Sequence, residues 1–130
     1  MGRGVLDAGV VLGWLRGQHR SMKKLAALFA ASRARRVNLN ISCVNLAEVL
    51  AHGAAYERAS GVDLVALLRG YNVEIHSPDE AIARRVAALP TSLADGFAAA
   101  TALELGARLH TTDRELARQL SGARISMSVY

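Results

Sequence analysis

The chain has 130 residues, 52% of them hydrophobic and 5% aromatic, so it can bury one core built mainly of alanine, valine and leucine. It has no run of about 18 uncharged apolar residues, no signal-peptide order at its start and one cysteine, Cys43, so we expect a cytoplasmic protein without an internal disulfide and with no membrane partner. The formal net charge of +5 comes almost entirely from arginine, whose planar guanidinium suits phosphate; nucleic acid is therefore an expected partner, and solubility is the alternative reason for the charge.

The sequence predicts strands that alternate with helices. Apolar residues at alternate positions predict strands, and apolar residues three and four positions apart predict helices. The first half of the chain gives a strand ending at Val5–Asp7, a helix over residues 10–15, a helix over Ser21–Arg35, a strand over Val37–Ser42 and helices over 45–54 and 56–69, the last either continuous or broken at Ser60–Gly61. The second half gives a strand over Asn72–His76, a helix with Pro78 at its first position, a helix over Ser92–Gly106, a strand over Ala107–Thr111, a short helix over 113–120 and a last strand over 123–130. Helical crossovers between strands build a parallel sheet covered on both faces, so we expect one α/β domain spanning residues 1–130.

Four carboxylates stand where the expected strands end and helices begin. Asp7 closes the first strand, and Asp113 follows the fourth. Glu48 lies one turn into the helix after the second strand, and Asp95 lies in the first turn of a later helix. Ligands of parallel sheets bind beyond the carboxyl ends of the strands, so we expect these four acids to converge on one small volume.

Helix capping is the alternative explanation for two of these acids. Residues 45–48 (NLAE) and 92–95 (SLAD) both have the pattern of a capping box, in which a short polar residue and an acid three positions later satisfy free amides. Acids in a first turn also complement the helix dipole. Taken singly, Glu48 and Asp95 therefore fit a capping role at least as well as a ligand role.

Two further boxes help to separate these explanations. We interpret residues 77–80 (SPDE) as a purely structural box, which makes Glu80 a control. In residues 112–115 (TDRE) the capping role falls on Glu115. Asp7 and Asp113 are then left without a structural explanation, and the convergence of all four acids favours a shared site.

A group of acids with no lysine to neutralise it favours a hard cation. Oxygen ligands select Mg²⁺ or Mn²⁺ over Zn²⁺. The histidines offer no competing zinc site, because they are scattered without paired ligand spacing; they are His19, His52, His76 and His110.

Three segments resemble the successive motifs of PIN-domain ribonucleases. They are VLDAGVVLGWL (5–15), ISCVNLAEVL (41–50) and SLADGFAAATALELGARLHTTD (92–113). The motifs occur in order and at plausible spacing, and the short one-domain form resembles VapC-type toxins of toxin–antitoxin pairs. The resemblance implies an α/β/α sandwich with a central five-stranded parallel sheet, a homodimer and a small VapB-like antitoxin as partner.

By position, the resemblance assigns the catalytic and metal-binding roles to Asp7, Glu48, Asp95 and Asp113. It makes Thr111 a supporting hydroxyl in the TTD segment, and it departs from the family where Gly96 follows the third acid in place of alanine. The implied reaction is hydrolysis of RNA phosphodiester bonds with one or two Mg²⁺ or Mn²⁺ ions, while arginines hold the RNA backbone.

Three other polar residues are possible helpers of this site. Ser42, Asn45 and Arg114 lie close to the proposed acids in the sequence. They are equally well explained as a strand end, a helix cap and an exposed side chain.

The first two helices carry more large apolar residues than the sheet requires. A partner helix laid in a groove uses apolar anchors spaced in this way, so we expect an antitoxin groove here, with ordinary core packing as the alternative. The residues of this expected groove are Trp14, Leu15, Leu25, Leu28 and Phe29.

Other functions compete with the toxin hypothesis. A phospho-acceptor signalling domain is also a small α/β protein, but it has paired acids after the first strand and a lysine after a late strand, and this chain has neither. A catalytically silent PIN-like binding module and a non-toxic RNA-processing nuclease both stay open.

Overall fold

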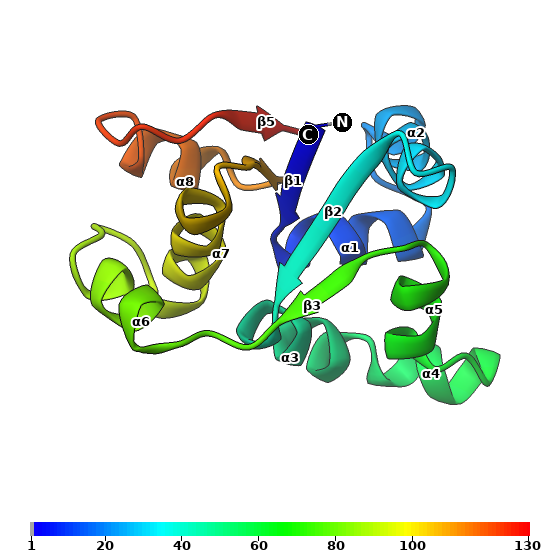
Figure 1. Cartoon of the computed structure of the whole chain (residues 1–130). Helices are drawn as coiled ribbons and strands as arrows, with labels where there is room; N and C mark the ends of the chain where they lie inside the picture. Colours follow the sequence, from blue (N-terminus) through cyan, green and yellow to red (C-terminus); the bar gives the residue numbers. More distant parts are fainter. Residues whose placement is uncertain (1) are drawn as a thin grey trace.

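Alternating strands and helices build a five-stranded parallel sheet with helices on both faces (Figure 1). The computed structural model describes residues 2–130. Its elements are β1 (Gly2–Leu6), α1 (Ala8–Arg16), α2 (Met22–Arg33), β2 (Val37–Ser42), α3 (Cys43–His52), α4 (Ala54–Ser60), α5 (Leu64–Gly70), β3 (Glu74–His76), α6 (Glu80–Ala87), α7 (Leu93–Leu105), β4 (Arg108–Thr111), α8 (Arg114–Gln119) and β5 (Met127–Val129). The predicted α/β class and parallel sheet are confirmed.

The strand order is β3-β2-β1-β4-β5, and every neighbouring pair is parallel. Parallel pairing puts the carboxyl ends of all five strands at one edge of the sheet, which we call the carboxyl edge, and their beginnings at the other, the amino edge. The strands that precede Asp7 and Asp113 are direct neighbours, because β1 pairs with β4 through Leu6 and His110. The ends of these two strands, and the residues that follow them, therefore lie side by side.

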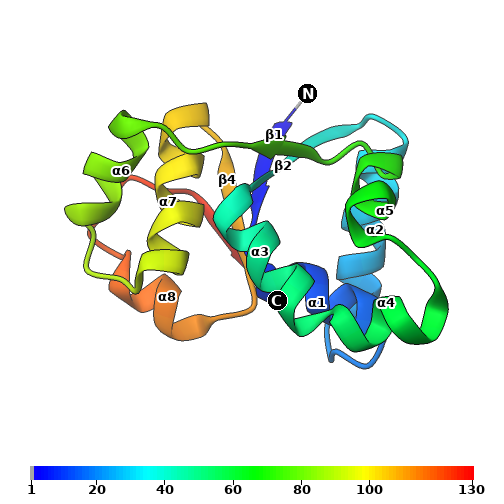
Figure 2. The same ribbon diagram turned by 90° about the horizontal axis from the view of Figure 1, so that it is seen from below.

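The two faces of the sheet bury separate apolar clusters. On one face Leu6, Leu39 and Ile41 pack with residues of α1, α2, α3 and α5. On the other face Val5 and Leu109 pack against the alanines of α7 and against α8. Figure 2 shows α6, α7 and α8 on one side of the strands and α1, α2, α4 and α5 on the other. The low aromatic content fits this packing, since small side chains let α7 approach the sheet closely.

Several helix boundaries differ from the sequence prediction. The break considered at Ser60–Gly61 is confirmed: the stretch 56–69 is two helices, α4 and α5, separated at Gly61, whose φ of 71° is left-handed and suits glycine. Helix α6 begins at Glu80 and is capped by Asp79, so Pro78 precedes the helix and is not its first residue. The box predicted over residues 77–80 is therefore wrong, although Glu80 remains an exposed residue far from the acids of the site. Within residues 2–130, no helix is both long and apolar enough to cross a membrane.

Candidate active site

Asp7 is the buried acid of the carboxyl edge. It follows β1 and caps α1, accepting a 2.9 Å hydrogen bond from the Val10 amide through Oδ1. Its side chain is nevertheless only 5% exposed. Burial raises the pKa of Asp7 from 3.8 to about 6, against the lowering effect of its hydrogen bonds, and the charges of Asp95 and Asp113 raise it further. A capping bond needs no such burial, so capping alone does not account for this position.

Thr111 links Asp7 to the neighbouring strand. The residue ends β4 and is fully buried. Its hydroxyl donates a hydrogen bond to Oδ2 of Asp7 and accepts one of 2.9 Å from the amide of Asp113. One hydroxyl thus fixes the orientation of one carboxylate and the backbone position of a second.

Asp113 has a capping role that the sequence analysis assigned to another residue. It is the N-cap of α8, and its Oδ1 accepts hydrogen bonds of 2.9 and 3.2 Å from the amides of Glu115 and Leu116. The prediction that Glu115 takes the capping role and leaves Asp113 unexplained is therefore wrong. Both capping bonds use the same oxygen, so Oδ2 of Asp113 is left out of the cap.

Glu48 lies in the middle of α3 and Asp95 in the first turn of α7, and the two helices meet at Asn45. The buried Asn45 amide group donates to Oε1 of Glu48 at 3.2 Å and to the carbonyl of Ala94 at 3.0 Å. It holds Glu48 beside the first turn of α7. Ser92 caps α7 by accepting from the Asp95 amide at 3.4 Å, which bears out the first half of that predicted box.

The capping box predicted over residues 45–48 is wrong. Helix α3 begins two residues earlier, at Cys43, and Ser42 caps it by accepting a 3.2 Å bond from the Val44 amide. Ser42 therefore serves as a helix cap and does not line the cavity that holds the four predicted acids. With the cap placed there, Glu48 loses its structural explanation, and Asn45 becomes the residue that orients it.

The four predicted acids line one cavity of about 230 Å³ at the carboxyl edge. Its lining contains no lysine, arginine or histidine. Asp95 and Asp113 both lie close enough to Asp7 for their charges to raise its pKa. The lining residues, which we call the acidic cavity, are Asp7, Ala8, Gly9, Glu48, Asp95, Thr112 and Asp113.

The donor set of the acidic cavity fits a hard divalent cation. Its charged lining groups are all carboxylates, and oxygen ligands of this kind suit Mg²⁺ or Mn²⁺. Among residues 2–130, no three acid, histidine or cysteine side chains lie close enough together to form a metal-binding group. Next to the cavity, Oδ1 of Asn45 is buried without a hydrogen-bond partner in the described structure.

Two cavity residues were missed by the sequence analysis. Thr112 and Gly9 face each other, because a Cβ built on Gly9 would lie 2.3 Å from Oγ1 of Thr112. A side chain at this position of α1 would therefore displace the Thr112 hydroxyl. The pattern AG after the first acid was the available signal, since glycine early in a helix often marks a close approach. Arg114, another predicted helper, is exposed at the start of α8 and does not line the cavity.

The expected groove on the first two helices is partly wrong. Leu25 and Phe29 are 0% exposed and belong to the core, where Phe29 stacks on Trp14 with ring centroids 3.9 Å apart. They cannot contact a partner on this surface. Trp14, Leu15 and Leu28 are half-buried against the same core, and Leu28 also lines a surface cavity between α2 and β5. Periodicity marked the apolar face of each helix but could not separate its buried part from its exposed part.

Comparison with known proteins agrees with this arrangement. The model of the family described as PIN domain matches residues 4–119. The chain is similar in structure to the VapBC2 complex from Rickettsia felis bound to a promoter DNA fragment, with 16% identity, a TM-score of 0.72 and 98% of each chain covered. A toxin–antitoxin complex from Klebsiella pneumoniae gives 20% identity, a TM-score of 0.70 and 98% coverage of both chains. FitAcB from Neisseria gonorrhoeae gives 20%, 0.68 and 95% of both chains. No curated protein is significantly similar in sequence.

Proposed function

The chain belongs to the PIN-domain family, and from this premise we propose that it is a Mg²⁺- or Mn²⁺-dependent endoribonuclease that acts as the toxin of a toxin–antitoxin pair. The observation that carries the proposal is the acidic cavity, in which four carboxylates from four separate segments of the chain meet without a cationic side chain. A purely structural role would not require Asp7 to be buried at the cost of a raised pKa.

Asp7, Asp95, Asp113 and Glu48 are the residues that would hold the metal ion. A bound Mg²⁺ or Mn²⁺ supplies Lewis-acid activation of water and stabilises negative charge on the phosphate. The chain itself keeps the ligands in place: Thr111 orients Asp7, Asn45 orients Glu48, and the cap of α8 fixes one oxygen of Asp113. Burial raises the pKa of Asp7 to about 6, and a positive charge in the cavity favours its ionised form.

The toxin part of the proposal has separate support. Several of the similar structures are toxin–antitoxin complexes, and together they cover nearly the whole of this chain. We infer a small VapB-like antitoxin and a homodimer by the same analogy of fold. The half-buried residues Trp14, Leu15 and Leu28 remain available to an antitoxin helix, whereas Leu25 and Phe29 do not.

A cleavage assay tests the nuclease proposal directly. Purified protein is incubated with total RNA in excess EDTA, and then with Mg²⁺ or Mn²⁺ added back, while fragment ends are sequenced. We expect defined cleavage only with the metal ion, and none from the Asp7→Asn variant. Full cleavage in EDTA would contradict the metal dependence. Tight RNA binding with no cleavage under any metal condition would favour the silent binding module.

A growth assay tests the toxin proposal. Expression of the wild-type chain alone is expected to arrest growth, and expression of the Asp7→Asn variant is not. Co-expression with the product of a small neighbouring gene should restore growth and give a stable complex. Harmless expression of a wild-type protein that cleaves RNA in vitro would reject the toxin role and leave a non-toxic RNA-processing nuclease.

A further inference from the structure

An exposed arginine lies at or shortly before the beginning of each strand. Arg3 lies in β1, and Arg108 is the first residue of β4. Arg35, Arg69 and Arg124 lie in the segments that lead into β2, β3 and β5. Because the strands are parallel, these five residues follow the amino edge of the sheet. We call them the arginine rim; it lies at the edge opposite the acidic cavity.

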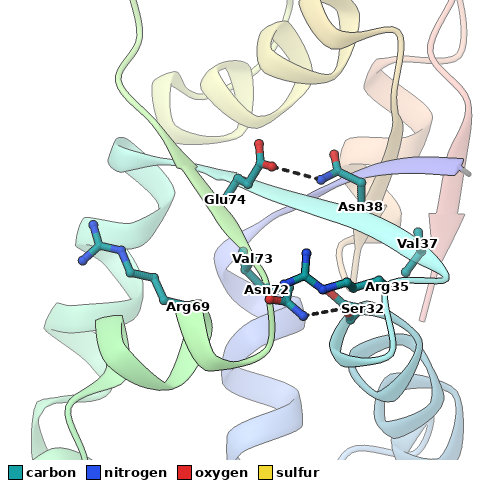
Figure 3. Close-up of a pocket in the computed structure, with 8 residues that line it drawn as sticks. All are labelled: Ser32, Arg35, Val37, Asn38, Arg69, Asn72, Val73 and Glu74. Atoms are coloured by element: carbon teal, nitrogen blue, oxygen red, sulfur yellow. Dashed lines mark hydrogen bonds between the residues drawn. The ribbon is translucent and has the colours of Figure 1, made fainter.

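Three surface cavities accompany the arginine rim. The first, of about 370 Å³, lies between the starts of β2 and β3 and is lined by Arg35 and Arg69 (Figure 3). The second, of about 390 Å³, is lined by Arg3 and shares Asn38 and Glu74 with the first. The third, of about 360 Å³, lies at the starts of β4 and β5 and contains Arg108 and Arg124. Each is larger than the acidic cavity.

The rim arginines form no ion pair with the described residues. The ion pairs of the described residues join Arg84, Arg85 and Arg118 to acids and His76 to Glu74. Arg3 and Arg108 donate to backbone carbonyls of Leu105 and Met127, which leaves their positive charge unneutralised. The one carboxylate among the cavity linings is Glu74, which accepts a 3.4 Å bond from Asn38. The rim therefore carries a clear excess of positive charge.

The chemistry of this edge favours nucleic acid over an acidic protein. Protein interfaces are anchored by large apolar and aromatic side chains. Exposed large hydrophobic residues in the described chain are Tyr56, Leu93 and Val129, and none lines a rim cavity. The rim offers arginine forks that suit phosphate.

We propose that the arginine rim binds the backbone of single-stranded RNA and that the three cavities beside it accept unstacked bases. Neighbouring strands lie about 4.8 Å apart, so the rim follows the edge for roughly 20 Å and can contact several successive phosphates. Single strands are favoured over duplexes because only unpaired bases can enter the cavities. This inference rests on the proposed function, whose substrate is RNA, and adds a binding surface remote from the acidic cavity.

Binding of a labelled oligonucleotide tests the rim. The probe is a fluorescein-labelled uridine 20-mer, titrated with the full chain in EDTA at several salt concentrations and followed by anisotropy. The double variant Arg35→Gln/Arg69→Gln should bind about tenfold more weakly than wild type. The slope of log Kd against log salt should fall by about 1.4, because each contact to a single-strand phosphate contributes about 0.7.

The matched control removes the same charge elsewhere. Arg84→Gln/Arg118→Gln alters two exposed arginines that pair with Glu80 and Glu115 on α6 and α8. It should change affinity less than threefold and leave the salt slope unchanged. Equal weakening by both double variants would overturn the proposal, since net charge alone would then explain binding.

Two further probes examine the identity of the ligand. A polyglutamate 20-mer that binds more tightly than the RNA, and is lost in Arg35→Gln/Arg69→Gln, would replace RNA by an acidic protein segment. An RNA duplex of 20 base pairs that binds as tightly as the single strand would contradict the role of the cavities. The measurement needs no cleavage, so rim binding without nuclease activity would reject the proposed function alone. Normal cleavage with unchanged binding by the rim variant would reject the rim alone.

Discussion

The two edges of the sheet carry opposite charges, and the fold itself explains part of this separation. In a parallel α/β protein, the helices that follow the strands begin at the carboxyl edge and end at the amino edge. The helix dipole favours acids at helix beginnings and bases at helix ends. Asp7 and Asp113 do cap helices, and Arg33 and Arg69 do lie in last turns. Helix dipoles therefore account for part of the charge separation between the two edges.

Burial distinguishes Asp7 from an ordinary helix cap. Asp79 caps α6 with a 2.9 Å bond to the Ile82 amide, and Asp7 makes the same bond to Val10 at the same distance. Asp79 is exposed, whereas Asp7 is 5% exposed and has a raised pKa. The two residues therefore share one capping geometry but differ in environment. Comparing them separates the contribution of the cap from that of the acidic cavity.

The largest effect is expected when the charge of Asp7 is removed and its helix cap is kept. Asn caps a helix as well as Asp does, so Asp7→Asn keeps the cap and removes only the carboxylate. We expect metal-dependent RNA cleavage to fall by more than about a hundredfold, because changes even to residues that only support a metal ligand cost about 10–100-fold. Asp95→Asn and Asp113→Asn should behave alike.

The control for this prediction is Asp79→Asn, which makes the same chemical change at an exposed cap. It should leave cleavage unchanged. Initial rates at saturating Mn²⁺ compare the variants. If Asp79→Asn lowers the rate as much as Asp7→Asn does, the acids act only as caps and the site assignment fails.

The carboxyl edge could be predicted from sequence to a useful extent. An acid directly after an apolar run marks a strand end, and parallel topology then brings such ends together, so the positions of Asp7 and Asp113 followed from local patterns. The capping partners did not follow. A Ser, Asn or Asp near a helix start is a good cap at several adjacent positions, and only the backbone path decides between Ser42 and Asn45.

The amino edge was not predicted from sequence. Its arginines are separated by 30 residues or more along most of the chain, and no local spacing connects them. Only the strand order, in which β1 lies between β2 and β4, brings Arg3 between Arg35 and Arg108. The buried part of the expected groove was wrong for a related reason. The depth at which Leu25 and Phe29 lie depends on packing against Trp14 and the sheet, which periodicity does not report.

The next prediction concerns stability without metal. The pKa of Asp7 is raised in the folded state, so the folded state holds this proton more tightly than the unfolded chain. The stability that this provides is present near pH 4 and is lost as the pH rises through about 6. In EDTA at pH 7.5, Asp7→Asn should therefore be more stable than wild type by up to about 3 kcal/mol, and the two should be nearly equal near pH 4.

Urea unfolding of both proteins at the two pH values measures this difference. His110 changes stability in the same range with the opposite sign, because burial lowers its pKa from 6.5 to about 4 and stability is lost as the pH falls. That contribution is common to both proteins and cancels in the difference. A stability gain of equal size at pH 4 and pH 7.5 would show that removal of the charge is not its cause.

A smaller effect is expected for the hydroxyl that joins the two strand ends. Thr111→Val removes the donor to Asp7 and the acceptor for the Asp113 amide, so both ligands lose their fixed orientation. We expect a loss of about 10–100-fold in cleavage and about 1–3 kcal/mol in stability. Thr101→Val is the matched control, since Thr101 is equally buried and its hydroxyl bonds to the Phe97 carbonyl within α7. It should lower stability without changing cleavage, as measured by rates at saturating Mn²⁺.

The smallest effect distinguishes the two polar residues at the start of α3. Ser42→Ala removes the cap, so it should lower the free energy of unfolding by about 1 kcal/mol and leave cleavage unchanged. Asn45→Ala removes two hydrogen bonds, including the one that holds Glu48, but it also removes a buried oxygen without a partner. These contributions oppose each other, so stability should change by less than about 1 kcal/mol, while cleavage falls about tenfold because Glu48 is no longer oriented. Unfolding curves and cleavage rates measured on the same two variants should therefore show opposite orders of severity. The same order in both measurements would assign Asn45 a purely structural role. It would also show that the bond from Asn45 to Glu48 does not contribute to cleavage.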